Sequence, residues 1–245
     1  KCATGDYIYY VDADDSIEPH TLECLVNEIN HKGLDIVGHE WYLTFNSNAR
    51  YMKQPAYTTS VEALRKMMGG VMRWNLWLFL VRSLYVENDI RFTEGLNMGE
   101  DMMVMMKLFI CAGKVGIVHR PFYHYRQSNP ESLTKIYSQE HIIQVANNVY
   151  EVEKYVNASA YADSLIEFIP FLKLNIKLPL LITDDKSHYE QWLECFPEAN
   201  CYVMNNKLLP LRTRIIQWMA VKRYFILLRL YYRTVFKLVY GIIYK

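Results

Sequence analysis

Three carboxylates follow an apolar run near the start of the chain. Residues 7–11 are aromatic or β-branched, and Asp12, Asp14 and Asp15 come directly after them. Such a run is typical of a buried strand, and open α/β sheets bind ligands at the carboxyl ends of their strands. Because like charges repel and because Mg²⁺ and Mn²⁺ prefer oxygen ligands, the spacing indicates a site for a divalent cation and a diphosphate. A solvated turn with an Asx helix cap is the alternative.

A second pair of acids, Glu100 and Asp101, follows Gly99 at the expected start of an apolar helix over residues 102–111. The helix dipole stabilises acids at this position, so helix capping alone would account for the pair. Considered together with the first acids, however, the pair gains a chemical role. An acid on a loop beside a cation site could act as a general base.

The sequence Tyr123-His124-Tyr125-Arg126 adds two polar groups at the end of another expected strand. Arg126 could contact a phosphate through two parallel hydrogen bonds, and His124 could be a ligand or a proton shuttle. For both residues the alternative is a structural hydrogen bond at the end of a strand.

The elements that must position these groups form an α/β pattern that becomes all-α after residue 132. A central strand is predicted over residues 7–12, and further strands are predicted over 35–45 and 115–126, with Pro121 at an edge or a bulge. Residues 74–85 could be a strand or a buried turn. Helices are predicted over residues 18–31, 58–68 (with Ser60 as a possible N-cap), 102–111, 137–156, 161–177 and 184–195.

Composition places the chain in the globular class. It has 245 residues, of which 51% are hydrophobic, and this is enough for one substantial core. An odd, scattered set of cysteines without a CxxC pair fits a reducing compartment such as the cytoplasm. These cysteines are Cys2, Cys24, Cys111, Cys195 and Cys201.

The end of the chain has a charge pattern of its own. No Asp or Glu follows Asn200, whereas Lys and Arg recur to the last residue. If residues 207–245 formed one helix, Lys222, Arg229, Arg233 and Lys237 would share a face, and the remaining surface would be largely apolar. This predicts a helix that lies on an anionic membrane surface. An oligomer contact or a core helix with a solvated basic stripe is the alternative. The uncharged stretches are far shorter than the ~18 residues of a transmembrane helix.

The ordered set of motifs resembles the family 2 glycosyltransferases of the GT-A fold, most of all the bacterial enzymes that build surface polysaccharides. The resemblance covers roughly residues 1–135. The matching pieces are Ala3-Thr4-Gly5-Asp6-Tyr7-Ile8, Val11-Asp12-Ala13-Asp14-Asp15 with Ile17 and Pro19, Asn88-Asp89-Ile90-Arg91-Phe92, Glu94-Gly95, Gly99-Glu100-Asp101 and Tyr123-x-Tyr125-Arg126.

The resemblance implies an α/β, GT-A-like fold, with a truncated Rossmann-like mixed sheet and an α-helical C-terminal region. The implied division is a catalytic part over residues 1–135, a helical extension over 136–206 and a membrane-surface tail over 207–245. Family members begin with about two further βα units that bind the nucleotide base. Because this chain starts one short step before the first predicted strand, we expect it to lack part of the donor pocket.

The resemblance also implies roles on the donor side and for catalysis. Asp14 would ligate Mg²⁺ or Mn²⁺, with Asp12 facing the ribose or the metal–diphosphate unit and Asp15 supporting both. Arg126 would contact the donor, which is a nucleotide-sugar and most simply a UDP-sugar. Asp101, with Glu100 beside it, would be the base in an inverting displacement.

On the acceptor side, Trp74 and Trp77 could stack on a sugar ring, with His124 near them, although burial of the tryptophans in the core is the alternative. The acceptor would be a saccharide or a lipid-linked saccharide. No nucleic acid is expected as a partner. The expected location is the cytoplasm, at the inner face of the cytoplasmic membrane.

Two other classes of protein remain open at this point. A haloacid-dehalogenase-type phosphatase also places Asp-x-Asp after a strand, with Asp12 as nucleophile and Asp14 as acid. That family expects Thr or Val at Ser16 and a later Gly-Asp-x-x-x-Asp motif, which the residues after Gly99 do not provide. A catalytically incomplete, membrane-docked scaffold is the other alternative.

Overall fold

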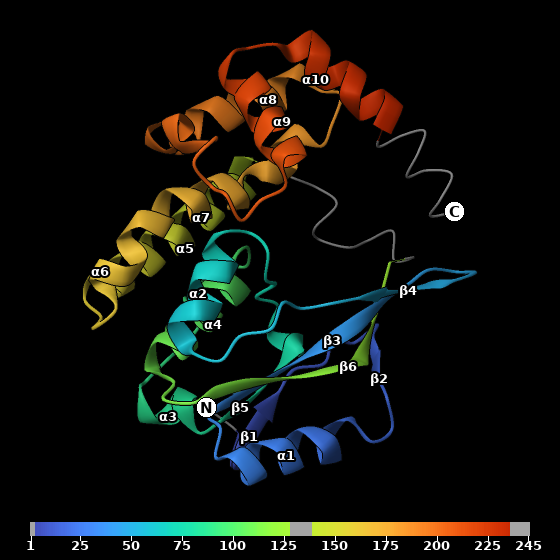
Figure 1. Cartoon of the computed structure of the whole chain (residues 1–245), viewed down its shortest axis with the longest axis vertical. Helices are drawn as coiled ribbons and strands as arrows, with labels where there is room; N and C mark the ends of the chain where they lie inside the picture. The colour runs from blue at the N-terminus through green and yellow to red at the C-terminus, as the bar shows by residue number, and fades with distance from the viewer. Residues whose placement is uncertain (1–2, 128–138, 236–245) are drawn as a thin grey trace.

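The computed structural model describes residues 3–127 and 139–235. Within this part, six strands form one mixed sheet in the order β1-β5-β3-β6-β2, and β4 pairs with β3. Figure 1 shows the sheet in the lower half of the molecule and most of the helices above it. The strands are β1 (Tyr7–Tyr9), β2 (Ser16–Ile17), β3 (Ile36–Thr44), β4 (Ala49–Met52), β5 (Phe79–Arg82) and β6 (Val115–Arg126).

The strand pairing differs from the expectation for the first strand. β1 is antiparallel to β5 and lies at one edge of the described sheet, so residues 7–12 are not a central strand and only residues 7–9 are extended. β3 and β6 run parallel at the centre, and β2 pairs with the end of β6 at the opposite edge. The loop from β1 to β2 must therefore cross the whole described sheet.

The long strand β6 contains the predicted irregularity. Its register against β3 shifts around Glu40, which faces Pro121. Proline has no N–H to donate to a ladder, so a bulge is one of the few places where a sheet accepts it. Of the two positions predicted for Pro121, an edge or a bulge, the structure shows the bulge.

The helices of the α/β half cover both faces of the sheet. They are α1 (Thr21–Lys32), α2 (Ser60–Met68), α3 (Leu84–Glu87) and α4 (Glu100–Cys111), with the 3-10 turn η1 (Leu76–Leu78) before β5. α1 ends at Gly33, whose φ of 62° is the left-handed conformation that glycine adopts at low cost. The N-cap of α2 is Thr59 rather than Ser60, because the Thr59 hydroxyl accepts from the Glu62 N–H at 3.2 Å. The Ser60 hydroxyl donates instead to the Ala112 carbonyl at 2.9 Å.

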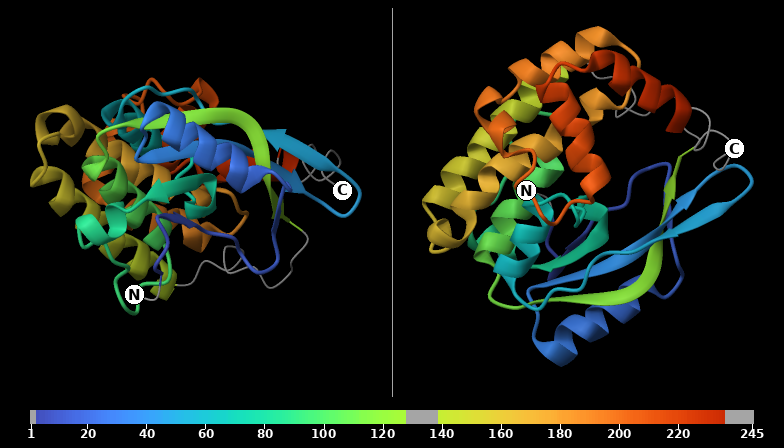
Figure 2. Two further views of the ribbon diagram at one scale, coloured as in Figure 1. Left: turned by 90° about the horizontal axis from the view of Figure 1, so that it is seen from below. Right: turned by 45° about the horizontal axis from the view of Figure 1, so that its top comes forward.

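The larger core lies between the sheet and α4. Seven of the twelve residues of α4 are buried and the other five are partly buried, which agrees with its apolar sequence. A smaller core of Leu25, Ile29 and Phe122 with their neighbours holds α1 against the other face. Figure 2 (right) shows α1 on the side of the sheet opposite to the later helices.

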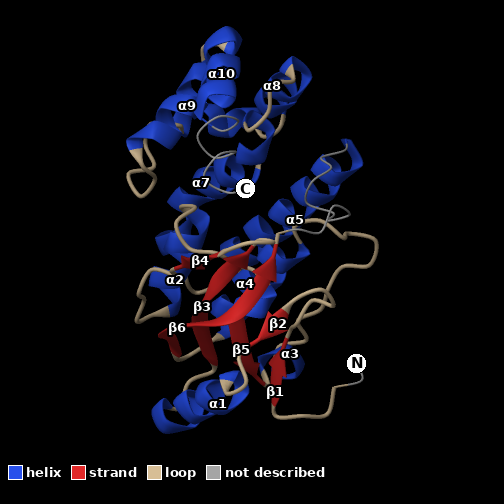
Figure 3. Cartoon of the chain, turned by 90° about the vertical axis from the view of Figure 1, so that its right-hand side faces the viewer, coloured by secondary structure: helices blue, strands red, loops and turns tan. Residues whose placement is uncertain are grey.

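The second half is helical, as predicted, and Figure 3 shows it as a body of helices beyond the strands. α5 joins it to the sheet by packing on α4 and on α7. The helices and 3-10 turns of this helical half are α5 (Gln139–Asn157), α6 (Ala162–Leu165), η3 (Ile166–Phe168), α7 (Ile169–Ile176), η4 (Leu178–Leu181), α8 (Lys186–Glu194), η5 (Pro197–Tyr202), α9 (Leu211–Val221) and α10 (Phe225–Tyr231).

A buried lysine connects several of these helices. The Lys177 ammonium donates to the carbonyl oxygens of Trp192 at 3.0 Å and Cys195 at 2.5 Å, and to Asn200 Oδ1 at 2.6 Å. It also lies 4.1 Å from the centre of the Trp192 ring. Burial lowers the pKa of Lys177 to about 8. The group therefore remains mostly charged at neutral pH, and these oxygens compensate part of the cost of its burial.

The basic tail is not one continuous helix. α9 ends at Val221, Arg223 has a φ of 57°, and α10 begins at Phe225. Lys222 therefore does not share a helical face with Arg229 and Arg233, and Lys237 lies outside the described residues. No helix in residues 3–127 and 139–235 is both long enough and apolar enough to cross a bilayer.

Candidate active site

The loop between β1 and β2 carries the first acids across the sheet. This segment, residues 10–15, is called here the acidic loop. It is tightened by a turn in which the Asp15 N–H donates to the Asp12 carbonyl at 3.1 Å. Since β1 and β2 are at opposite edges of the described sheet, the loop passes over the ends of the strands between them. The acids thus lie where the sequence predicted, at the ends of strands.

Tyr123 on β6 fastens this loop to the sheet. Its phenol oxygen accepts a hydrogen bond from the Asp12 N–H at 3.0 Å and donates one to Asp15 Oδ2 at 2.7 Å. The other Asp15 oxygen accepts from the Arg126 N–H at 2.8 Å. Both oxygens of Asp15 are thus bonded to β6, which makes Asp15 a residue that holds the loop in place.

Sequence reasoning assigned no role to Tyr123. The residue is fully buried, and its ring stacks on Trp77 with centroids 4.3 Å apart and planes 14° apart. Burial raises the pKa of Tyr123, so the phenol keeps its proton and acts as a donor. The period of two along a strand could have predicted an inward ring, but nothing in the sequence indicates the contact with a loop more than a hundred residues earlier.

The three carboxylates of the acidic loop repel one another. Burial raises the pKa of Asp12, and the charges of Asp15 and Asp14 raise it further. Burial also raises the pKa of Asp15, and the hydrogen bonds from Arg126 and Tyr123 oppose this shift. A divalent cation would relieve this repulsion, and carboxylate oxygens are the ligands that Mg²⁺ and Mn²⁺ prefer. In the described part of the chain, no three His, Cys, Asp or Glu side chains converge to hold a metal by themselves.

The second pair of acids lies at the start of α4, within the electrostatic field of the acidic loop. Gly99 precedes the helix with a φ of 79°, and Asp101 Oδ2 accepts a hydrogen bond from the Leu76 N–H at 3.4 Å. Burial is the main cause that raises the pKa of Asp101 to about 7, followed by the charge of Glu100, and the charge of Asp12 adds to it. Glu100 also has a raised pKa, mainly through burial and partly through Asp12. The fold thus brings together acids that are about ninety residues apart in sequence.

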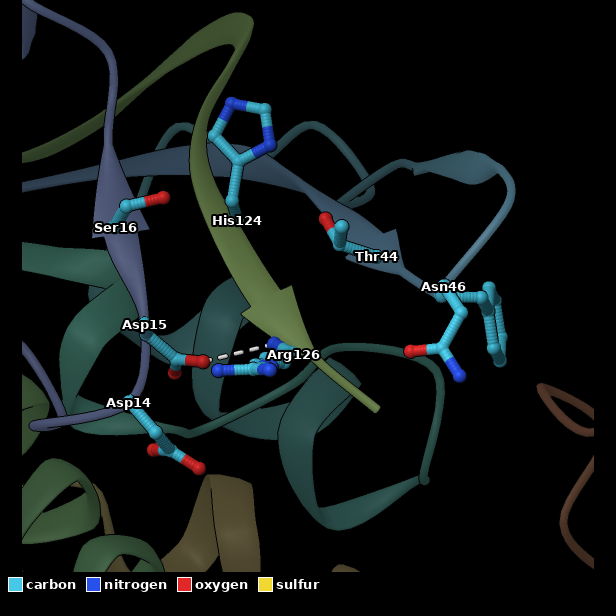
Figure 4. A pocket seen from close by; sticks show the side chains of 8 residues that line it. Asp14, Asp15, Ser16, Thr44, Asn46, His124 and Arg126 are labelled. Carbon is cyan, nitrogen blue, oxygen red and sulfur yellow. Dashed lines mark hydrogen bonds between the residues drawn. The ribbon is translucent and has the colours of Figure 1, made fainter. Parts of the chain in front are cut away.

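A cavity of about 390 Å³ opens beside the acidic loop. Figure 4 shows the Arg126 side chain extending toward Asp14 and Asp15, with Asn46 on the far side. Asp101 is not among the described residues that line it. The lining residues are Asp14, Asp15, Ser16, Thr44, Phe45, Asn46, His124 and Arg126.

His124 lines the cavity and is held in place from two sides. Its Nε2 lies 2.8 Å from Glu18 Oε1. Its ring stacks on Tyr42 with centroids 5.0 Å apart. His124 thus makes the structural hydrogen bond that the sequence offered as the alternative role, and it also forms part of the cavity wall.

The two tryptophans proposed for the acceptor side have different environments. Trp77 is only 4% exposed and is enclosed by Trp41, Tyr123 and Tyr125. It cannot offer its face to a sugar, so the prediction of an acceptor role for Trp77 is wrong and the core alternative holds. Trp74 is partly buried and packs at the margin of the core.

We expect Tyr123→Phe to lower the free energy of unfolding by about 1.5–3 kcal/mol, because it removes the hydrogen bond to a charged carboxylate while keeping the ring stack. Urea denaturation measures this change. The matched control is Tyr125→Phe, at a neighbouring tyrosine of β6 whose ring also packs on Trp77. An equal loss in both variants would contradict a specific role of Tyr123 in holding the loop.

Comparison with known proteins finds similarity to glycosyltransferases. The model of the family "Glycosyl transferase family 2" matches residues 1–107. The uncharacterized glycosyltransferase EpsJ of Bacillus subtilis is 29% identical over 144 residues, which are 56% of this chain and 42% of EpsJ. The cholesterol galactosyltransferase of Borreliella burgdorferi is 32% identical over 136 residues, or 49% of this chain and 37% of that protein. The minor teichoic acid biosynthesis protein GgaB of B. subtilis is 22% identical over 226 residues, which are 85% of this chain and 24% of GgaB. The chain spans less than half the length of these relatives.

Among solved structures, residues 1–349 of S. aureus TarS in complex with UDP-GlcNAc superpose with a TM-score of 0.62 at 16% identity. The match covers 94% of this chain and 68% of the TarS fragment. At this identity the likeness establishes the fold, including the mixed sheet and the helices that follow it. With the family match to residues 1–107, it shows a GT-A fold, and the similarity to glycosyl transferase family 2 lies in that first part of the chain.

Proposed function

We propose that the chain transfers a sugar from a nucleotide-sugar to an acceptor hydroxyl, with inversion at the anomeric carbon. The observation that carries this proposal is the position of Asp101, a largely buried carboxyl with a pKa of about 7 beside the acids of the acidic loop. A general base works best when its pKa lies near the working pH, because it must be ionised and still bind a proton strongly.

The donor would bind at the acidic loop. We assign Asp14 and Asp12 to a divalent cation, Mg²⁺ or Mn²⁺, and Arg126 to the donor's phosphates, with Asp15 holding the loop. When bound, the cation would neutralise the negative charge that develops on the leaving diphosphate. The match to a protein solved with UDP-GlcNAc supports a UDP-sugar as the donor.

Asp101 would remove the proton from the acceptor hydroxyl as the oxygen attacks the anomeric carbon. The Leu76 N–H fixes one carboxylate oxygen, so the other can face the acceptor. The negative charge of Glu100 raises the pKa of Asp101 and thus strengthens it as a base. Attack from the side opposite to the leaving group is a single displacement, and a single displacement inverts configuration.

The acceptor would be a saccharide or a lipid-linked saccharide of a bacterial surface polysaccharide, because GgaB is named for teichoic acid biosynthesis and spans most of this chain. His124 and Trp74 remain the acceptor-side residues in this proposal. Residues 1–135 would be the catalytic part, residues 136–206 a helical extension, and residues 207–245 the contact with the inner face of the cytoplasmic membrane. The phosphatase and scaffold alternatives gain no support from the family match.

The test is an assay of the gene product that contains this sequence, incubated with a panel of nucleotide-sugars with and without Mn²⁺. Release of UDP that requires Mn²⁺ and is abolished by a chelator is the expected result. Release of inorganic phosphate from a monoester would favour the phosphatase. Failure to bind or turn over any nucleotide-sugar would favour the scaffold and contradict the proposal.

A further inference from the structure

Exposed apolar side chains gather on the last two described helices. On α9 they recur at every third or fourth position, and on α10 three of them lie within five residues, the most exposed being Ile226 at 84%. Spacings of three and four place residues on one face of a helix. We call this set the α9–α10 patch, and its members are Leu211, Ile215, Trp218, Tyr224, Ile226, Leu227 and Leu230.

α9 and α10 pack on each other beside these side chains. Trp218 near the end of α9 contacts Tyr224 just before α10, with ring centroids 5.7 Å apart. The core contacts are made by other residues, since Ile216 and Ala220 of α9 and Leu228 of α10 are buried. The exposed side chains are therefore not needed to hold the helices in the fold.

The surroundings of the patch are cationic. Arg212, Lys222 and Arg229 are exposed on or beside the two helices, and no Asp or Glu occurs after Asn200. The nearby acids belong to the preceding part of the chain, where hydrogen bonds from Ser187 lower the pKa of Asp185 and the charge of Arg229 lowers it further. Arg223 pairs with Glu190 at 2.8 Å and Arg233 pairs with Asp184 at 3.4 Å, in both cases across to the preceding part of the chain. Exposed pairs of this kind contribute little to stability and can exchange partners.

The patch lies at one end of the molecule. Figure 1 shows α8, α9 and α10 at the end opposite to α1, and Figure 3 shows the same arrangement from the side. A flat surface can therefore approach α10 without meeting the sheet.

We propose that the α9–α10 patch docks the protein on an anionic membrane surface. Apolar side chains would enter the interface, Trp218 and Tyr224 would lie at the level of the lipid headgroups, and the basic residues would contact lipid phosphates. The positive charge of the basic residues favours an anionic membrane over a second copy of the chain, because two copies that met face to face would bring like charges together. The proposal rests on the membrane contact given to residues 207–245 in the proposed function, for which it names the docking side chains, and it does not depend on the reaction.

The test is sedimentation of the full chain with vesicles of equal parts phosphatidylglycerol and phosphatidylcholine. Binding that is lost with phosphatidylcholine alone, and that weakens as salt is added, is the expected result. We expect Ile226→Ser with Leu230→Ser to weaken binding by at least about 10²-fold, since two large apolar side chains would no longer be buried in the interface. Arg229→Gln should weaken it about fivefold, the equivalent of about 1 kcal/mol for a basic residue near an anionic surface.

Val86→Ser is the matched control, because Val86 is 81% exposed on α3, far from the patch in sequence and outside the cationic region. It should bind vesicles as the parent does. Equal binding by the parent and the Ile226/Leu230 variant would overturn the proposal, as would gel filtration that shows a dimer which this variant abolishes. Release of UDP, measured separately, reports on the proposed reaction, so either idea can fail without the other.

Discussion

Asp101→Asn is expected to reduce sugar transfer by about 10²–10⁴-fold, the usual contribution of a positioned general base. Asparagine has nearly the same shape and can still accept the hydrogen bond from the Leu76 N–H, but it cannot take up a proton. Binding of UDP in the presence of Mn²⁺ should remain within a fewfold of the parent. Turnover measured beside calorimetric binding of UDP separates these two effects.

The raised pKa of Asp101 also predicts the direction in which sugar transfer and stability change with pH. Because burial raises the pKa of Asp101 to about 7, transfer by the parent should increase as the pH rises through about 7. The folded state also binds this proton more tightly than the unfolded state does, so the stability contributed by Asp101 is lost as the pH rises through the same value. At pH 8 we therefore expect Asp101→Asn to be at least as stable as the parent, which thermal unfolding at pH 6 and pH 8 can measure.

Glu100→Gln is the control for Asp101, since it removes a neighbouring charge and leaves the proposed base intact. It should lower the pKa of Asp101 and shift the pH profile toward acid, with a much smaller loss of rate. If Asp101→Asn retained most of its activity, or if both variants lost activity equally, the assignment of the base would be wrong.

The second large effect is expected for Asp14→Asn, which should weaken Mn²⁺-dependent binding of the donor by at least about 10²-fold. Even residues that only support metal ligands cost about 10–100-fold when they are removed, so a ligand should cost no less. Asp14 lines the cavity beside the acidic loop, where a cation could contact both the protein and the donor's phosphates. Titration of UDP with and without Mn²⁺ measures the effect, which should disappear when the cation is left out.

Asp15→Asn is the contrast for Asp14. Both oxygens of Asp15 accept hydrogen bonds from β6, so this change should lower the free energy of unfolding more than Asp14→Asn does. Its effect on Mn²⁺-dependent binding should be smaller. The opposite order, with Asp15 as the stronger determinant of cation binding, would reverse the roles of the two residues.

Much of the fold could be predicted from local patterns. The apolar run of α4, the bulge at Pro121 and the glycine at the end of α1 each follow from the sequence within one or two turns of chain. Strand order could not be predicted, because the pattern of residues 7–9 is equally suitable for a central and an edge strand. The break in the tail at Arg223 was also missed, since a positive φ at arginine has no sequence signal.

The acids of the candidate site could be chosen from their spacing, whereas their arrangement could not. The buried phenol of Tyr123 sets the position of the acidic loop, and a tyrosine in an aromatic strand reads as ordinary core. Trp77 was misjudged for the same reason, because an aromatic residue in a core and one that faces a sugar have the same local sequence. Only the three-dimensional contacts separate these cases.

The ammonium of Lys177 limits where the helical half can be shortened. It follows α7, but the oxygens that solvate it belong to the end of α8 and to η5, so a chain cut between residues 178 and 192 would keep the cation and lose its acceptors. Truncated forms should therefore either retain η5 or end before Lys177.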